Sequence, residues 1–209
     1  MIDARHFLVF LGAATLLAAA PGPGMLYVLA RTLAGGKREG ILSSLGTFCG
    51  GLVHVVAAAT GLSLLLAASA TAFAIIKYAG AVYLVYLGVR MILDADHEAE
   101  VPIQASRRNP FCQGVATEAL NPKTALFFLA FIPQFVNRAA GHVIWQFLIL
   151  GAISVTLNTS GDLLVTLLAS PIAARLRSSF TLRRRQRRLT GATLIGLGVY
   201  LAAAPGHSE

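Results

Sequence analysis

Three ionisable side chains lie inside otherwise apolar stretches of this sequence: Glu118, Lys123 and Asp162. Each would cost roughly 2.5–3.5 kcal/mol at the centre of a lipid-facing helix, so we expect all three to face the interior of a helix bundle. A buried acid that alternates between its protonated and ionised forms can couple another process to proton entry. Asp162 and Glu118 are therefore candidates for proton coupling, and a static pair with Lys123 or an interhelical hydrogen bond is the structural alternative.

Other polar residues accompany these groups at helical spacing. Ser154, Asn158 and Asp162 follow one another at i+4, which places them on one face of a helix as a supporting polar stripe. His54 is a third candidate for proton coupling, although a lone histidine in such a segment can equally be hydrogen-bonded packing. The pair Gly46-x-x-x-Gly50 predicts a close approach of two helices.

Two sequence breaks interrupt apolar segments, and their residues are the candidates for binding a substrate. Proline removes a backbone donor and glycine tolerates strained backbone angles, so neither break allows an intact helix. Carbonyls freed before the first break suit an ammonium group, and amides at the start of each second half-helix suit an anion, to which a lysine adds charge. A zwitterionic amino acid carries both groups. A kinked membrane helix repaired by its neighbours is the alternative. In the second break, Asn121 and Pro122 are expected to be the N-cap and the first residue of a new half-helix. The candidate residues are Pro21, Gly22, Pro23, Gly24, Asn121, Pro122 and Lys123.

The composition is that of a polytopic membrane protein. Of the 209 residues, 56% are hydrophobic and 12% are charged, with mean hydropathy +0.70, whereas soluble domains are about a quarter charged. The net charge of +8 invites a nucleic-acid interpretation. Because the basic residues lie between apolar segments, membrane topology explains them better, and we expect no nucleic-acid partner. Cys49 and Cys112 lie within or beside apolar segments and are expected to pack as small hydrophobes.

The apolar segments predict an all-α fold of six transmembrane helices in one transporter domain over residues 1–209. Two halves, about 1–93 and 110–206, are joined by a polar loop at 94–109, and each half begins with a broken segment. Three crossings per half make the halves run oppositely, as a 3+3 inverted repeat with broken helices 1 and 4. Such paired interruptions are typical of secondary transporters, with the binding site near the midplane. The expected segments are about 6–34, 40–67, 72–93, 110–136, 142–173 and 189–205.

Basic residues are distributed unevenly between the two sides of these six crossings. Thirteen of the 17 Lys and Arg residues lie in or beside the loops after the first, third and fifth segments, and three lie on the opposite side. This asymmetry predicts cytoplasmic basic loops, the last at 175–188, and both termini outside.

Several motifs resemble the LysE family of amino-acid exporters, in its homoserine/threonine efflux-type branch. They are Ala20-Pro21-Gly22-Pro23-Gly24, Leu45-Gly46 to His54, Lys77 to Leu84, Asn121 to Phe128 and Pro133-Gln134-Phe135. The resemblance implies a six-helix, oligomeric exporter of amino acids or their derivatives in the bacterial inner membrane, driven by proton antiport. We also expect membrane lipid as a partner and no cofactor. The characteristic positions of the family fall on residues 21–23 and 121–123. Gly24 stands where that branch often carries a polar residue.

Two other functions fit less of the sequence. A metal-ion exporter needs clustered carboxylate, His or Cys ligands, for which His54, Glu118 and Asp162 are the available set. A membrane thiol–disulfide carrier needs two activated cysteines, and Cys49 and Cys112 lack a CxxC motif. We find no catalytic constellation and therefore do not expect an enzyme.

Overall fold

The computed structural model describes residues 4–62, 70–93, 95, 109–137, 139–169 and 180–203. Within these ranges the chain is helical and contains no strand, which confirms the all-α prediction. The longer helices are α1 (Ala4–Ala19), α2 (Pro23–Ala57), α4 (Ala70–Leu93), α5 (Pro110–Ala119), α7 (Val143–Leu167) and α9 (Phe180–Ala203). The shorter ones are η1 (Ala58–Leu62), α6 (Pro122–Leu126), η3 (Phe127–Phe131) and η4 (Ile132–Phe135).

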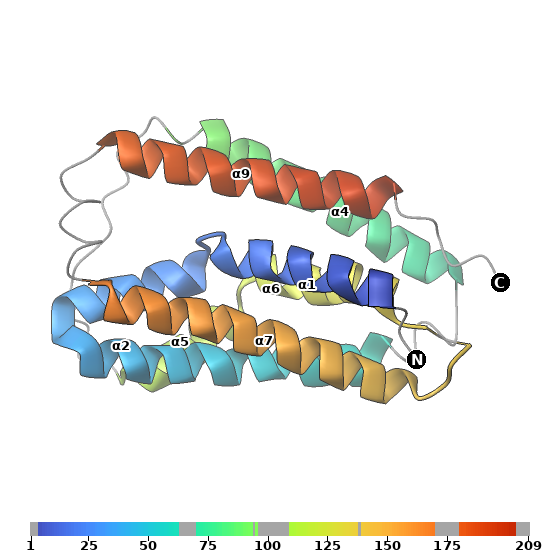
Figure 1. Ribbon diagram of the computed structural model, residues 1–209, viewed down its shortest axis with the longest axis horizontal. Coiled ribbons are helices and arrows are strands. Elements are labelled where there is room, and N and C mark those ends of the chain that lie inside the picture. Colours follow the sequence, from blue (N-terminus) through green and yellow to red (C-terminus); the bar gives the residue numbers. More distant parts are fainter. Residues whose placement is uncertain are drawn as a thin grey trace.

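The helices run along one long axis in two groups (Figure 1). Helices α4 and α9 lie side by side and antiparallel, and α1, α2, α5, α6 and α7 form the second group. The two paired helices touch at glycines: a Cβ atom built on Gly88 would lie 2.5 Å from the carbonyl oxygen of Gly191, and the reverse also holds. The ring of Phe131, in η3, lies 5.8 Å from that of Tyr200 in α9, which joins the two groups.

The first predicted break is present. Helix α1 ends at Ala19 and α2 begins at Pro23, with proline at its first turn. Helix α2 then continues past Gly36, where φ is +79° and the chain reverses direction (Figure 1). Only glycine adopts this backbone angle at little cost, so Gly36 makes the turn between the predicted segments 6–34 and 40–67. The Arg31 guanidinium lies 3.3 Å from the Glu39 carboxylate across this turn.

The second predicted break is present as well. Helices α5 and α6 are separated at Leu120–Asn121, and the two arms of this segment are bent by 43°. The Asn121 side chain accepts a hydrogen bond from the backbone amide of Lys123 at 3.0 Å, with Pro122 at the first helical position. Asn121 is therefore the N-cap of the second arm, as the sequence predicted.

One boundary prediction was wrong. Residues 175–188 were expected to form a basic loop, but α9 already begins at Phe180. Arginine, leucine and glutamine are strong helix formers, so this basic stretch extends the helix in front of the apolar segment. Residues 175–179, and all of the predicted loop at 94–109 except residues 95 and 109, lie outside the described ranges.

Three described helical stretches are long and apolar enough to cross a membrane, and a fourth qualifies if the bent pair counts as one span. They are Pro23–Gly61, Ala74–Leu93, Val143–Leu167 and the pair Pro110–Ala119 with Pro122–Phe135. The apolar stretches His6–Ala19 and Arg188–Ala203 are shorter. At 1.5 Å per residue, the 25 residues of α7 extend about 37 Å, enough to cross the hydrocarbon core.

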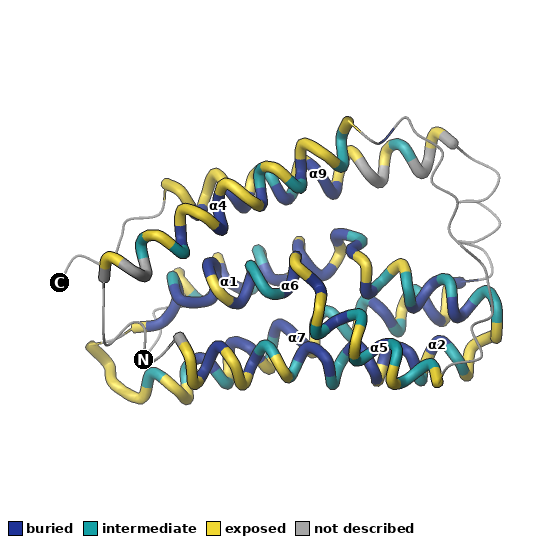
Figure 2. Tube along the Cα trace, turned by 180° about the vertical axis from the view of Figure 1, so that it is seen from behind, coloured by how far each residue is buried: buried dark blue, intermediate teal, exposed yellow. Residues whose placement is uncertain are grey.

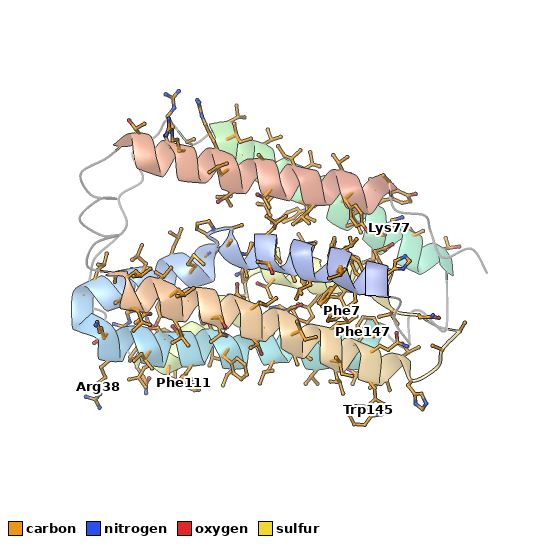
Figure 3. The ribbon with its side chains drawn as sticks, viewed as in Figure 1. Phe7, Arg38, Lys77, Phe111, Trp145 and Phe147 are labelled. Carbon is orange, nitrogen blue, oxygen red and sulfur yellow. The ribbon has the colours of Figure 1, made fainter. Side chains whose placement is uncertain are left out.

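Exposed and buried residues alternate along the helices, with the exposed ones facing away from the bundle (Figure 2). On α7, Trp145 points outward with 64% of its surface exposed, whereas Phe147 points inward and is buried (Figure 3). Large exposed apolar side chains also include Val82 on α4 and Leu164 on α7. An apolar exterior of this kind suits lipid, in agreement with the composition.

Helices α2 and α5 pack with unusually little separation. Gly46 faces the backbone carbonyl of Phe111 so closely that a Cβ atom would collide with it, and a Cβ on Gly50 would lie 2.6 Å from the carbonyl oxygen of Val115. The predicted role of Gly46 and Gly50 in close helix approach is therefore confirmed. This contact fixes the end of α5 beside Gly50, in the part of α2 that follows the Gly36 turn.

Candidate functional site

The two helix breaks meet through one side chain. The Lys123 ammonium, at the start of α6, donates hydrogen bonds to the backbone carbonyls of Leu17 at 3.1 Å and Ala20 at 2.8 Å, at the end of α1. In an uninterrupted helix the Leu17 carbonyl would accept from the amide of residue 21, but Pro21 has no N–H. The Leu17 carbonyl still accepts from the Ala20 amide at 3.2 Å, and the lysine adds a donor in place of the one that the proline break removes.

Backbone features at both breaks place Lys123 there. Asn121 and Pro122 start α6 so that Lys123 lies in its first turn, and Lys123 is only 6% exposed. Its side chain crosses directly over Gly22, the N-cap of α2. A Cβ atom at Gly22 would lie 3.0 Å from Cε and 3.1 Å from Nζ of the lysine, so a glycine at this position gives the ammonium room to reach the carbonyls.

Glu118 lies on the other side of the same junction. Its carboxylate is buried and accepts hydrogen bonds from the Asn121 amide at 3.0 Å and from the Thr124 hydroxyl at 2.6 Å, one on each oxygen. Gly24 faces this carboxylate so closely that a Cβ atom would collide with Oε2. A side chain at position 24 would therefore occupy the same space as the Glu118 carboxylate, and glycine leaves that space to the acid.

Asp162 is fully buried on α7 and has less support. One carboxylate oxygen accepts a hydrogen bond from the Thr47 hydroxyl at 2.8 Å, and the other, Oδ1, has no hydrogen-bond partner among the described residues. A buried oxygen without a partner is costly when the carboxyl is ionised and is an open position for a proton or a water. Glu118 differs from Asp162 in that both of its carboxylate oxygens are hydrogen-bonded.

The remaining predicted residues lie around these groups. The ring nitrogen Nε2 of His54 is 3.0 Å from the backbone carbonyl oxygen of Glu118, and the imidazole stacks on Phe128 at 5.9 Å. Ser154 is bonded to its own helix, through the Leu150 carbonyl at 2.8 Å. Asn158 is half-buried one turn further along α7. The structure thus holds His54 by a backbone contact and an aromatic ring.

A cavity lies between α1, α2, α7 and the second break. Its polar wall contains one basic residue, Lys123, and one acidic residue, Glu118, together with Ser154 and Asn158. The rest of the lining is largely apolar. In this conformation it has room for about one water molecule, so a larger solute can enter only after side chains or helices move. The lining residues are Ala14, Leu17, Ala18, Thr47, Gly51, Glu118, Lys123, Thr124, Phe127, Phe128, Ser154, Val155 and Asn158.

The structure brings most of the predicted site residues together and adds two that the sequence analysis missed. Thr47 links the cavity wall to Asp162, which does not itself line the cavity, and Thr124 holds Glu118. Thr124 directly follows Lys123 in the second break, so its position was a usable signal. Thr47 lies on α2 far from any break, and nothing in the sequence pairs it with Asp162.

The two alternative chemistries find little in this geometry. Cys49 is half-buried on α2 and Cys112 is exposed on α5, and both are free thiols. Among the residues whose placement is described, no three His, Cys, Asp or Glu side chains gather as a metal-ion site. His54 contacts the backbone of Glu118 rather than its carboxylate, and Asp162 is bonded to a threonine.

Comparison with known proteins assigns the chain to a family. It is 31% identical over 211 residues to an uncharacterized membrane protein of Vibrio cholerae, covering 97% of this chain and 99% of that protein. It is 30% identical to a leucine efflux protein of Salmonella typhimurium, over 69% of this chain and 70% of that protein. It is 28% identical to a homoserine/homoserine lactone efflux protein of the same species, over 93% and 95% of the two chains. No solved structure matches the chain. The model of the LysE type translocators matches residues 15–204, and the chain therefore belongs to this family of membrane transporters, which are not enzymes.

Proposed function

We propose that this protein exports amino acids by binding them where its two broken helices meet. The main support is the pair of hydrogen bonds from Lys123 to the carbonyls of Leu17 and Ala20. These bonds join the C-terminal carbonyls of α1, which the proline break deprives of backbone amide donors, to the start of α6. Broken helices that face each other within a bundle are typical binding sites of secondary transporters. The efflux proteins named among the relatives support the same direction of transport.

The cavity lining favours a zwitterion with an apolar side chain. Lys123 offers a cation for a carboxylate, and Glu118 and the α1 carbonyls offer acceptors for an ammonium. Around them, Leu17, Phe127 and Val155 present apolar surface to a side chain. Leucine has this combination of groups, and it is the substrate in the name of one relative. We therefore take leucine as the first substrate to test and homoserine as the second.

Proton antiport is proposed to run through Asp162 rather than Glu118. Both oxygens of Glu118 are already held by Asn121 and Thr124, whereas one oxygen of Asp162 has no partner among the described residues. Thr47 touches Asp162 and lines the cavity, so a proton on the acid and a solute in the cavity can influence each other through one hydroxyl. The alternative role of Asp162 is a static interhelical hydrogen bond.

The proposed arrangement in the membrane is six spans in one domain, as two inverted halves that each begin with a broken helix. Both breaks lie about midway along the long axis, and α1 begins and α9 ends at the same end of the molecule (Figure 1). Arg38 projects from the opposite end, and Trp145 projects outward near the end where α1 begins (Figure 3). Arginine favours the cytoplasmic side and tryptophan the interface, so we propose cytoplasmic basic turns, external termini and an inner-membrane location. A homo-oligomer is compatible with the exposed apolar faces.

The function is tested with purified protein in liposomes loaded with labelled leucine or labelled homoserine. We expect release above that of protein-free liposomes, accelerated when the outside is made acidic, because entering protons drive the exit of substrate. Release of either amino acid that ignores the proton gradient would support transport and remove proton antiport. No release of either one above the protein-free background would contradict the proposed function.

A further inference from the structure

The ammonium of Lys123 occupies a position that would also suit the ammonium of an amino-acid substrate. The carbonyl of Leu17 lacks its i+4 donor because residue 21 is proline, and its backbone bond is a longer one of 3.2 Å from the Ala20 amide. The carbonyl of Ala20 lies in the break itself. Both are strong acceptors, and both accept from Lys123. A primary ammonium on a substrate has the same charge and the same N–H donors as the lysine side chain. The two cations therefore compete for one pair of carbonyls.

The geometry around Lys123 suits a displaceable contact. The lysine reaches the carbonyls through a flexible side chain that passes over Gly22 without a side chain in its way. Among the described residues it forms no ion pair with a carboxylate within 4 Å, and the hydrogen bonds of its ammonium go to the two backbone carbonyls. Lys123 also lines the cavity, which has room for only about one water molecule in this conformation. Withdrawal of the lysine from the carbonyls would give a solute space and acceptors together.

We infer that Lys123 is a tethered occupant of the substrate's ammonium subsite, and that substrate binding exchanges the two cations. When an amino acid enters, its ammonium takes the carbonyls of Leu17 and Ala20, and the released Lys123 ammonium pairs with the substrate's carboxylate. The empty protein keeps these carbonyls satisfied, and only a ligand with both charges gains on both sides of the exchange. The lysine thereby selects zwitterions over simple amines. This inference rests on the amino-acid transport proposed above.

The exchange is tested by comparing two probes on wild type and on K123M. One probe is leucine, and the other is 3-methylbutylamine, which is leucine without its carboxyl group. In K123M we expect leucine affinity to fall about tenfold or more, because a charge-assisted hydrogen bond to its carboxylate is lost. We expect affinity for the amine to rise about tenfold, because the competing lysine no longer fills the subsite. Binding is measured with labelled leucine and by the shift in melting temperature that each probe causes in detergent.

Two further variants keep the comparison interpretable. K123Q retains an amide donor for one of the two carbonyls, so it is expected to fold if K123M does not, with smaller shifts in the same directions. K37M removes an exposed lysine from the Gly36 turn and should leave both affinities as in wild type. Opposite shifts for the two probes support the exchange. Equal losses of affinity for leucine and for the amine, or an affinity that stays at the wild-type value for one probe or for both, would overturn it. Wild type that binds and exports neither leucine nor homoserine would instead overturn the proposed function.

Discussion

Replacing Asp162 with asparagine is expected to abolish gradient-driven export while leaving exchange of leucine across the membrane. The asparagine is nearly isosteric and can still accept from Thr47, so the contact between α2 and α7 is preserved. It cannot bind or release a proton. One proton moving through 100 mV supplies about 2.3 kcal/mol, which supports a substrate gradient of about fiftyfold. We therefore expect the maximum gradient in proteoliposomes to fall from about that value to no gradient in D162N.

The comparison variant for this experiment is E118Q. Glu118 accepts from the Asn121 amide and the Thr124 hydroxyl, and an amide in its place would turn one donor against another. We expect E118Q to weaken leucine binding but to keep the transport that remains dependent on the proton gradient. A D162N protein that still builds the wild-type gradient would remove Asp162 from coupling. Loss of the gradient in E118Q, with counterflow intact, would move that role to Glu118.

Adding a side chain at Gly24 is expected to disable the site through Glu118. In G24S the new side chain must displace the carboxylate, which breaks its hydrogen bonds to Asn121 and Thr124. Leaving a buried charged group without such bonds costs about 1–3 kcal/mol or more, so we expect leucine binding to fall by about tenfold to a hundredfold. The matched control is G12A, because a Cβ at Gly12 in α1 meets nothing within 4 Å.

Because a side chain at position 24 and the Glu118 carboxylate compete for the same space, the double variant G24S/E118A gives a more specific test. If the defect of G24S comes from collision with the acid, shortening the acid should relieve it. We expect G24S/E118A to bind leucine better than G24S does, so that the two substitutions are not additive in a double-mutant cycle. Additive losses would show that residue 24 acts independently of Glu118. The same relation gives a physical reason for glycine at position 24, because any side chain there meets the Glu118 carboxylate.

Local chemistry was enough to predict the breaks. Pro21 and Pro23 remove backbone donors whatever the surroundings, and an asparagine before a proline is a strong helix start. The sequence therefore located both interruptions, and Asn121 caps its helix as predicted. The prediction of a loop at 175–188 misses the start of α9, because it uses the arginines only as a sign of the cytoplasmic side. Arginine also favours helix, and α9 begins at Phe180.

The contacts between distant segments could not be read from the sequence. The sequence at the breaks predicts carbonyls available to a substrate, but in the structure the Lys123 ammonium donates hydrogen bonds to them. Which carbonyls the lysine reaches depends on how α1 and α6 face each other. The pairing of Thr47 with Asp162 likewise depends on the packing of α2 against α7, since 115 residues separate them. Sequence spacing orders residues within a helix, and only tertiary packing brings two helices together.

The two breaks are proposed to enclose a cavity that a transported amino acid occupies. The labelling rate of a single cysteine in the cavity wall, S154C in a C49S/C112S background, reports this occupancy. Ser154 is chosen because its hydroxyl bonds to the Leu150 carbonyl of its own helix, so we expect cysteine to be accepted there. The native exposed Cys112, in a C49S background, is the control. With leucine at ten times its Kd, we predict that N-ethylmaleimide labels the S154C thiol about tenfold more slowly, since only the unoccupied fraction reacts, while Cys112 is unaffected. An S154C thiol labelled at the same rate with and without leucine, in protein that exports leucine, would contradict the account.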